Sequence, residues 1–182
     1  MSQTKDLQSS LISKCKQNDA KAQLQLYDDY SKAMFVTAYN FVKQEAVAED
    51  IMQESFIKAF KKIDSFNGKV TFGAWLKRIV INHCLDWLKK RKLRIVSINS
   101  EHINIPQEDN WEVEDDINVD HIYSAIEDLP DKYKIVLKLF LFEGYDHQEI
   151  GEILQISEVT SRSQVFRAKS KLRELLKIYN YA

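Results

Sequence analysis

The segment from residue 143 to residue 164 limits the possible folds of this chain more than any other. Asp146 stands where a helix N-cap belongs, and Glu149 three residues later can return a hydrogen bond to the N–H group of the cap. Apolar residues then follow at helical spacing, namely Ile150, Ile153 and Leu154. This pattern predicts a short, capped, amphipathic helix.

A second helix follows that one closely. Gly151 allows close approach, the break falls at 155–157, and Ser157 can cap the next helix. The second helix is basic. Beyond its first turn its single acid is Glu174, and its basic residues include Arg162, Arg167, Lys169, Lys171 and Arg173. A capped helix, a tight turn and a basic helix are typical of insertion into the DNA major groove. The alternative is an ordinary helical hairpin with a solvated basic face.

The rest of the chain is also predicted to be helical. Four Gly and two Pro in 182 residues exclude a glycine-rich nucleotide loop and favour long helices. Helical periods run over 19–42, with Asp19 as N-cap, over 46–63 and over about 70–92, and no strand alternation is visible. The third of these helices is expected to bury Phe72, Leu76, Ile79, Val80, His83 and Trp87. Two more helices are expected, one beginning around Ile122 and one running from 131 to 142, so the fold class is all-α.

Charge is strongly segregated, although the formal net charge is only −1. Bases dominate 77–94, where Asp86 is the single acid, and neither Lys nor Arg occurs between 95 and 131. The simplest interpretation is two DNA-facing modules joined by an acidic connector. The predicted domains are therefore 1–94, a flexible acidic linker at 95–120, and 121–182.

A polar stripe opposes the apolar face of the 46–63 helix, and it consists of Asp50, Gln53, Glu54 and Ile57. Carboxylate-bridged metal bundles need Glu-x-x-His pairs, and none of the four histidines follows a Glu by three residues. Two interpretations remain open. One is a solvated face, and the other is a docking face, because an apolar Ile among carboxyl and amide groups suits an interface rim.

Another stripe follows the 70–92 helix, and it consists of Trp75, Arg78, Asn82, Asp86 and Lys89. Aromatic rings stack on exposed bases, Asn binds base edges and cations hold phosphates, so this combination suits single-stranded DNA. The preceding loop, residues 65–71, could form one wall of a pocket for an unstacked base. The alternative is that Trp75 and Trp87 are core residues and that the bases form a solvated helix end.

The sequence suggests no catalysis. Cys15 and Cys84 form neither a disulfide framework nor a zinc cluster, and no serine lies in a Gly-x-Ser-x-Gly setting. We assign no catalytic residue, metal or cofactor. The amino-terminal residues lack the apolar core of a signal peptide, and no run approaches a membrane span, so we expect a soluble cytoplasmic protein without membrane insertion.

Taken together, these segments resemble the bacterial RNA polymerase sigma factors of the extracytoplasmic-function (ECF) group within the sigma-70 family. The first half resembles sigma region 2 through 48–60, through 72–76, and through Asn82 and Asp86 before the basic run. The second half resembles sigma region 4 in the segments Leu129-Pro130, Glu143-Gly144-Tyr145, Phe166-Arg167-Ala168-Lys169 and Leu172-Arg173. The resemblance covers nearly the whole chain.

The resemblance implies specific partners and contacts. Polymerase docking, on the clamp helices of the largest subunit of core RNA polymerase, would fall to Asp50, Gln53, Glu54 and Ile57. Contacts to the promoter −10 element would come from Phe66, Asn67, Trp75, Arg78, Asn82, Asp86 and Lys89. Contacts to the −35 element would come from Thr160, Arg162, Ser163, Phe166, Arg167, Lys169 and Lys171. The implied function is promoter-specific transcription initiation with melting of the −10 element, and an anti-sigma factor is a further expected partner.

The chain departs from the family pattern around its turn. Gln155 stands where Gly is usual, Val159 replaces a frequent Gly, and Ser161 occupies a commonly apolar position. Two other classes of protein remain as alternatives. A free-standing dimeric helix-turn-helix regulator would need a dimer face, and a sigma-sequestering helical protein would not need the basic residues between 162 and 173.

Overall fold

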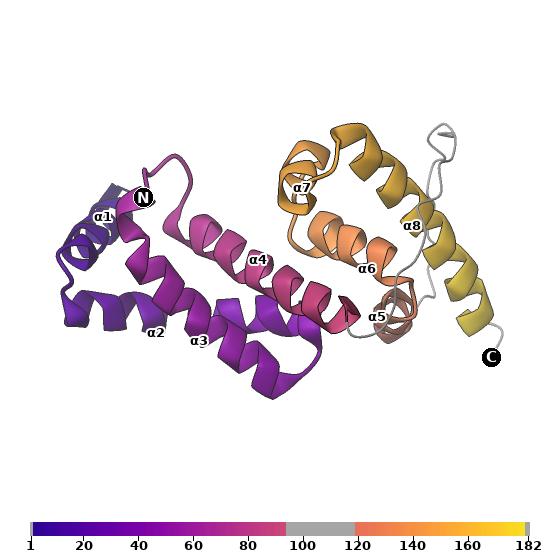
Figure 1. Ribbon diagram of the computed structural model, residues 1–182, viewed down its shortest axis with the longest axis horizontal. Helices are drawn as coiled ribbons and strands as arrows, with labels where there is room; N and C mark the ends of the chain where they lie inside the picture. The colour runs from indigo at the N-terminus through magenta and orange to yellow at the C-terminus, as the bar shows by residue number, and fades with distance from the viewer. Residues whose placement is uncertain (1, 94–118, 181–182) are drawn as a thin grey trace. The chain divides into compact units, whose positions relative to one another are not determined.

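The computed structural model describes the backbone of residues 2–93 and 119–180, with side chains for 9–91 and 119–177. Every regular element in these ranges is a helix, which confirms the all-α prediction. The chain divides into two compact units, residues 1–98 and residues 99–182 (Figure 1). Among the described helices, none combines the length and hydrophobicity that crossing a membrane requires.

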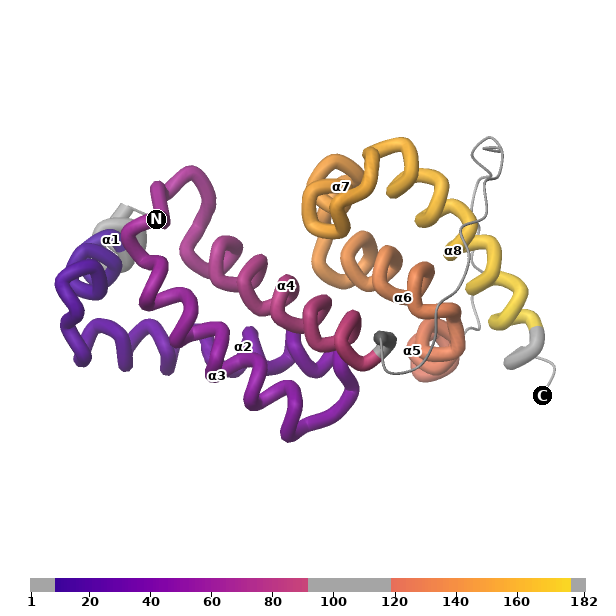
Figure 2. Tube along the Cα trace, viewed as in Figure 1, coloured from indigo at the N-terminus to yellow at the C-terminus, as the bar shows by residue number. Residues whose placement is uncertain are grey.

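The first unit is a helical bundle. Its elements are α1 (Ser2–Lys16), α2 (Ala20–Val42), α3 (Glu45–Lys61), the 3-10 turn η1 (Ile63–Ser65) and α4 (Phe72–Leu93). Helices α2, α3 and α4 pack against one another, while α1 packs on α2 and on η1 (Figure 2). The helix α1 was not among the predicted elements.

Local chemistry sets the ends of α2. The Asp19 carboxylate accepts hydrogen bonds from the backbone N–H groups of Lys21 and Ala22 at 2.9 and 3.0 Å, which confirms the predicted N-cap. The bond from Ala22 lowers the pKa of Asp19 below its usual value. At the other end Lys43 adopts the left-handed conformation and its N–H group bonds to the carbonyl of Tyr39.

Helix α4 buries a different stripe from the predicted one. Of the predicted core residues, three are buried, namely Phe72, Leu76 and Val80, and three are only half-buried, namely Ile79, His83 and Trp87. Buried in addition are Ile81, Cys84 and Leu85. The reason is that α4 packs against both α2 and α3, so its buried surface is wide and extends past the narrow stripe that periodicity selects.

The second unit is built around one long helix. Its elements are α5 (Val119–Glu127), α6 (Asp131–Leu137), the π-helical segment η2 (Lys138–Phe142), α7 (His147–Leu154) and α8 (Glu158–Asn180). Helix α8 contacts α5, α6 and α7, so it forms the spine of this unit. Val119 and Asp120, which the prediction placed in the linker, are the first residues of α5, and residues 95–118 of that linker lie outside the described residues.

The helix predicted over 131–142 changes its winding at Lys138. Beyond Leu137 the chain continues in π-helical turns, and the N–H group of Glu143 bonds to the carbonyl of Lys138 five residues back. Lys138 is only 2% exposed, and its ammonium group lies 2.7 Å from the Glu127 carboxylate of α5. The wider turns therefore accompany an ion pair between a buried lysine of η2 and a partly exposed glutamate of α5.

Candidate nucleic-acid interface

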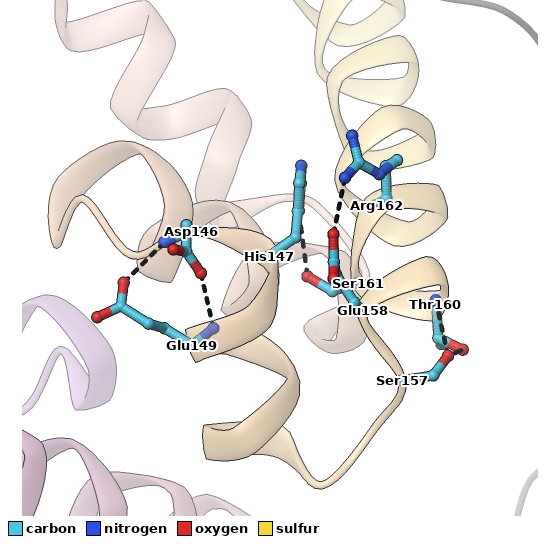
Figure 3. Close-up of polar contacts among 8 residues, drawn as sticks. All are labelled: Asp146, His147, Glu149, Ser157, Glu158, Thr160, Ser161 and Arg162. Atoms are coloured by element: carbon cyan, nitrogen blue, oxygen red, sulfur yellow. Dashed lines mark hydrogen bonds and ion pairs between the residues drawn. The ribbon is translucent and has the colours of Figure 1, made fainter.

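Helix α7 begins with the capping box that the sequence predicts (Figure 3). The Asp146 carboxylate accepts from the N–H group of Glu149 at 2.8 Å, and the Glu149 carboxylate accepts from the N–H group of Asp146 at 3.0 Å. Two backbone donors at the start of α7 are thereby satisfied, which fixes where the helix begins.

The turn between α7 and α8 depends on a glycine and a left-handed residue. A Cβ atom added to Gly151 would lie 2.8 Å from the carbonyl oxygen of Ile156 and 3.5 Å from the nitrogen of Glu158, where α8 starts. Gln155 has φ of 57°, so it takes the conformation that Gly adopts most easily. The turn is tight in the way that the predicted helix-turn-helix requires.

Helix α8 starts with its own cap. The Ser157 hydroxyl accepts from the N–H group of Thr160 at 3.0 Å and lies 2.7 Å from the Thr160 hydroxyl (Figure 3). The Arg162 guanidinium pairs with Glu158, one turn earlier, at 2.8 Å, and both side chains are about half exposed. This pair holds Arg162 at the exposed start of α8.

The predicted −35 contact residues do not share one face. Arg162 and Lys171 are exposed, whereas Thr160, Ser163, Phe166 and Arg167 are half-buried. The Lys169 ammonium lies over the Phe140 ring of η2 at 4.9 Å, so this side chain is directed along the unit instead of away from it.

A histidine that the predictions did not assign links α7 to α8. His147 Nδ1 lies 3.3 Å from the hydroxyl of buried Ser161 (Figure 3). The imidazole also stacks on Phe140, with ring centroids 5.1 Å apart. Burial, together with the nearby charge of Arg162, lowers the pKa of His147. The buried hydroxyl of Ser161, which stands where an apolar residue was expected, thus has this imidazole as its hydrogen-bond partner.

The first unit carries the second basic helix. On α4, Asn82, Asp86 and Lys89 are exposed along one stripe, and Arg78 and Trp75 are half-buried at its beginning. The Trp75 ring packs on Phe66 and Phe72, with centroids 5.4 and 5.7 Å apart, so it is anchored in the core on one side. The core interpretation of Trp75 therefore holds in part, and its contact with single-stranded DNA stays a prediction.

One predicted −10 residue, Phe66, is buried. It is only 8% exposed, because its ring packs against both Trp75 and Phe72 in a cluster of three aromatic rings. Its ring supports Trp75 and is not displayed for a base to stack on. The neighbouring Asn67 is exposed, and its side-chain oxygen accepts from the N–H group of Lys69 at 3.1 Å, which shapes the loop.

The polar stripe of α3 is exposed throughout its length. Asp50, Gln53 and Glu54 are exposed, and Ile57 exposes 54% of its surface. Glu54 lies 3.1 Å from His83 Nε2 on α4.

His83 connects this stripe to helix α4. Its Nδ1 lies 3.4 Å from the hydroxyl of Ser55, so the imidazole bridges α3 and α4. Burial and the charge of Lys58 lower the pKa of His83. Cys84, its neighbour in sequence, points away into the core, as the helical geometry predicts.

Comparison with known proteins supplies the context for these two interfaces. Residues 26–94 match the family description of sigma-70 region 2, and residues 120–172 match that of sigma-70 region 4. The ECF RNA polymerase sigma factor SigW of Bacillus subtilis is 30% identical over 177 residues, which cover 91% of this chain and 95% of SigW. The chain belongs to the ECF sigma factors.

Two further proteins agree with this assignment. The ECF sigma factor SigE of Mycolicibacterium smegmatis is 28% identical over 163 residues, and the match spans 84% of this chain but only 60% of that relative. The solved structure of the sigma factor RpoE from Bartonella quintana, in complex with the anti-sigma factor NepR, superposes with a TM-score of 0.60 and 25% identity. That superposition covers 85% of this chain and 96% of RpoE.

Within this sigma factor, sequence patterns did not indicate three of the polar contacts. These are the Lys138–Glu127 pair, the His147–Ser161 contact and a hydrogen bond from Lys16 to the carbonyl of Phe66. Each joins residues from different helices or from a helix and a distant loop, so no spacing along the chain reveals it. In the sequence, only the polar Ser161 at a commonly apolar position hinted at one of these contacts, the one with His147.

Proposed function

We propose that this ECF sigma factor binds core RNA polymerase and directs transcription initiation to specific promoters, without a chemical reaction of its own. It would do so through two DNA-binding helices of the protein. The observation that carries the proposal is the presence of two separate basic helices, α4 and α8, in two units of one chain. A helix-turn-helix alone would serve many regulators, but a second helix with an anchored tryptophan, an exposed amide and cations suits unpaired DNA.

Polymerase docking is assigned to the exposed stripe of α3, formed by Asp50, Gln53, Glu54 and Ile57. An exposed isoleucine surrounded by carboxylate and amide groups gives an apolar centre with a polar rim, which is the composition of a protein interface. The carboxylates favour a basic partner surface, such as one on the clamp helices of the largest polymerase subunit.

The −10 element is assigned to α4 and the loop before it. Trp75 is half-buried, and Asn82, Asp86 and Lys89 line the exposed stripe beyond it. Arg78 lies one helical turn after Trp75, and Asn67 lies in the loop before α4. A base that leaves the duplex loses pairing and stacking worth about a few kcal/mol, and a preformed aromatic site offsets part of that cost.

The −35 element is assigned to the start of α8. Arg162 is exposed there, and Glu158 holds its guanidinium by an ion pair that DNA would have to replace or share. Ser163, Phe166 and Arg167 lie along the next two turns, and Thr160 adjoins the cap. Lys171 suits a phosphate contact because it is exposed, and Lys169 contributes its charge from beside Phe140.

The protein is placed in the cytoplasm, where core RNA polymerase and chromosomal DNA are found. We infer an anti-sigma factor as a further partner, because RpoE of Bartonella quintana, to which the chain is similar, is bound to one. Copurification with an epitope-tagged form of this chain from its source cells tests that inference.

The decisive experiment mixes the purified full-length protein with sigma-free core RNA polymerase and maps the transcripts made from source genomic DNA. New start sites that require the protein, preceded by two shared sequence elements, are expected. If the protein binds operator-like DNA alone and yields no new starts with core polymerase, the free-standing regulator is the correct assignment.

The docking assignment has its own test. Asp50→Ala combined with Ile57→Ala should weaken binding to core polymerase by about tenfold, as loss of a central interface contact does. Glu54 is left intact because it also contacts His83. Asp28→Ala, an exposed acid on α2, is the matched control. Equal core affinity of the double variant and the wild type would remove docking from this stripe.

Arg162→Ala tests the −35 assignment. The variant should lose about 1–3 kcal/mol at the cognate −35 element if Arg162 contacts a base edge. Binding is measured for the polymerase complex on the cognate promoter and on variants with single changes in the −35 element. A uniform loss on every sequence would reassign Arg162 to a phosphate contact.

A further inference from the structure

The amino-terminal helix contacts the loop that precedes α4. Lys16, the last residue of α1, donates a hydrogen bond from its ammonium group to the carbonyl oxygen of Phe66 at 3.2 Å. Helix α1 also packs on η1, the 3-10 turn at the start of this loop. The match to sigma-70 region 2 begins only at residue 26, so the contact comes from a part of the chain outside the matched segment.

The backbone around Lys16 is firmly held. The side chain of Cys15 is fully buried, which fixes the end of α1 against the bundle. Asn18, with φ of 60°, donates to the carbonyl of Cys15 at 3.0 Å, and Asp19 donates to the carbonyl of Lys14 at 3.1 Å. These two bonds form a Schellman motif, and Asp19 then caps α2. Lys16 therefore extends from a rigid corner.

The group that Lys16 binds belongs to the residue that supports Trp75. The Phe66 ring packs on Trp75 and Phe72, with centroids 5.4 and 5.9 Å apart. Other bonds shape the loop from within, such as the one from the Ser65 hydroxyl to the carbonyl of Lys62 at 2.7 Å. The bond from Lys16 differs because it reaches the loop from a distant element and sets the position of the Phe66 backbone against α1.

We propose that Lys16 is a positioning residue for promoter opening, which holds the 65–71 loop and Trp75 in the shape that receives an unpaired base. The inference rests on the proposed function of this loop at the −10 element. A loop that is already ordered loses less conformational entropy when the base arrives, so capture of the base is favoured. The positive charge of Lys16 also suits the carboxyl end of α1, where the helix dipole is negative. A charged donor makes a stronger hydrogen bond than a neutral one.

The test uses the full-length protein with core polymerase on a promoter mapped as described above. Lys16→Met should slow open-complex formation by about fivefold, the order expected for one charge-assisted hydrogen bond at a partly exposed site. The rate of opening is measured from the reactivity of unpaired thymines in the promoter toward permanganate. Affinity for a single-stranded −10 oligonucleotide should fall by a similar factor, while affinity for core polymerase stays unchanged.

Two matched variants separate positioning from other roles. Lys16→Arg keeps a charged donor and should restore most of the opening rate. Lys14→Met removes a charge from the same helix end and should behave as the wild type. In the free protein, Lys16→Met should also speed hydrogen exchange of the amides between 65 and 71, and Lys14→Met should not.

Four results would overturn the proposal. Opening at the wild-type rate would show that the bond has no effect on the loop. Equal losses on all DNA, with a salt slope reduced by about one, would make Lys16 a phosphate contact. Weaker core binding or a lower melting temperature would make it a structural residue. Absence of any initiation by the wild type would refute the proposed function itself, and it is visible before any variant is made.

Discussion

At the scale of single residues, Lys138 shows how a charged side chain can be buried at the start of an otherwise apolar helical segment. It is almost fully buried, and its ammonium group contacts the Glu127 carboxylate, which Lys134 also approaches at 3.4 Å. The pair joins η2 to α5, two elements that the sequence places more than ten residues apart. Its net contribution to stability is small when both partners are present, because desolvation offsets much of the attraction.

Removing the Glu127 carboxylate should cost more than removing the Lys138 charge, because Lys138 is buried whereas Glu127 is partly exposed and also lies near Lys134. Glu127→Gln takes away the carboxylate charge next to buried Lys138 and should lower the free energy of unfolding of the second unit by about 2–3 kcal/mol. Lys138→Met fills a similar volume and should cost less than about 1 kcal/mol. Guanidinium unfolding of the full chain measures both. The reverse order of the two effects would contradict the pairing.

His147 makes the second unit sensitive to acid. Burial and the charges of Arg162 and Lys169 lower its pKa, while Glu158 and Asp146 oppose this shift. A lowered pKa in the folded state means that the folded protein prefers the neutral imidazole. Its contribution to stability is therefore complete above the unfolded pKa of about 6.5 and is lost as the pH falls below that value.

The corresponding measurement is hydrogen exchange of α7 and α8 at pH 7.5 and at pH 5.5. The intrinsic exchange rate of every amide also falls as the pH is lowered, so the quantity compared is the protection factor, which is the intrinsic rate divided by the observed rate. Protection should drop at the lower pH in the wild type and should drop less in His147→Gln. His83 has a lowered pKa as well, but it lies in the other unit, so its effect falls on α3 and α4. An equal pH response in the wild type and in His147→Gln would exclude His147 as the cause.

At the scale of secondary-structure elements, the α7–α8 turn is the most demanding local geometry in the second unit. Gly151→Ala would put a Cβ atom 2.8 Å from the backbone oxygen of Ile156, which cannot move aside as a flexible side chain can. The variant should lose about 1–3 kcal/mol of stability and should weaken −35 binding by displacing the start of α8. Gly144 has open space around it, so Gly144→Ala, with its positive φ, controls for backbone strain alone.

The same turn offers a stabilising change. Gln155 adopts the left-handed conformation, which costs a residue with a Cβ atom about 1 kcal/mol relative to glycine. Gln155→Gly should therefore stabilise the second unit, by less than about 1 kcal/mol because glycine is also freer in the unfolded chain. Thermal unfolding measures the gain, and a lower melting temperature would show that the Gln155 side chain contributes a favourable contact.

At the scale of the whole molecule, the chain consists of two units, each with its own core. Phe56, Phe72 and Leu76 lie in the core of the first, and Leu137, Ile150 and Leu172 lie in that of the second. The two helices proposed to contact DNA, α4 and α8, thus belong to different units. This arrangement suits a promoter whose −10 and −35 elements are separated along the DNA. Disruption of one core should leave the other unit intact.

A fragment experiment tests this independence. Residues 1–98 expressed alone should unfold cooperatively and should bind core polymerase, because the α3 stripe belongs entirely to this unit. The fragment should give no discrimination among −35 sequences, because α7 and α8 are absent. Binding to core polymerase that requires residues 99–182 would show that docking is shared between the units.

Much of this architecture was predictable, and particular residues show why. Asp19, Asp146 and Ser157 cap helices through bonds to residues two or three positions away, so the sequence contains both partners. The exposed α3 stripe followed from helical periodicity for the same reason. The position of Phe66 was not predictable, because whether an aromatic ring fills a core or faces solvent depends on elements elsewhere in the chain.

The sequence alone therefore determined most of the helices, the predicted caps, the tight turn and the charge segregation, because each depends on residues close together along the chain. Only the tertiary structure decided the packing of Phe66 under Trp75, the burial of Lys138 beside Glu127, the contact of His147 with Ser161 and the reach of Lys16 to the loop. These contacts join residues that are far apart in sequence or in different elements. Their formation depends on how whole helices pack, which no local pattern encodes.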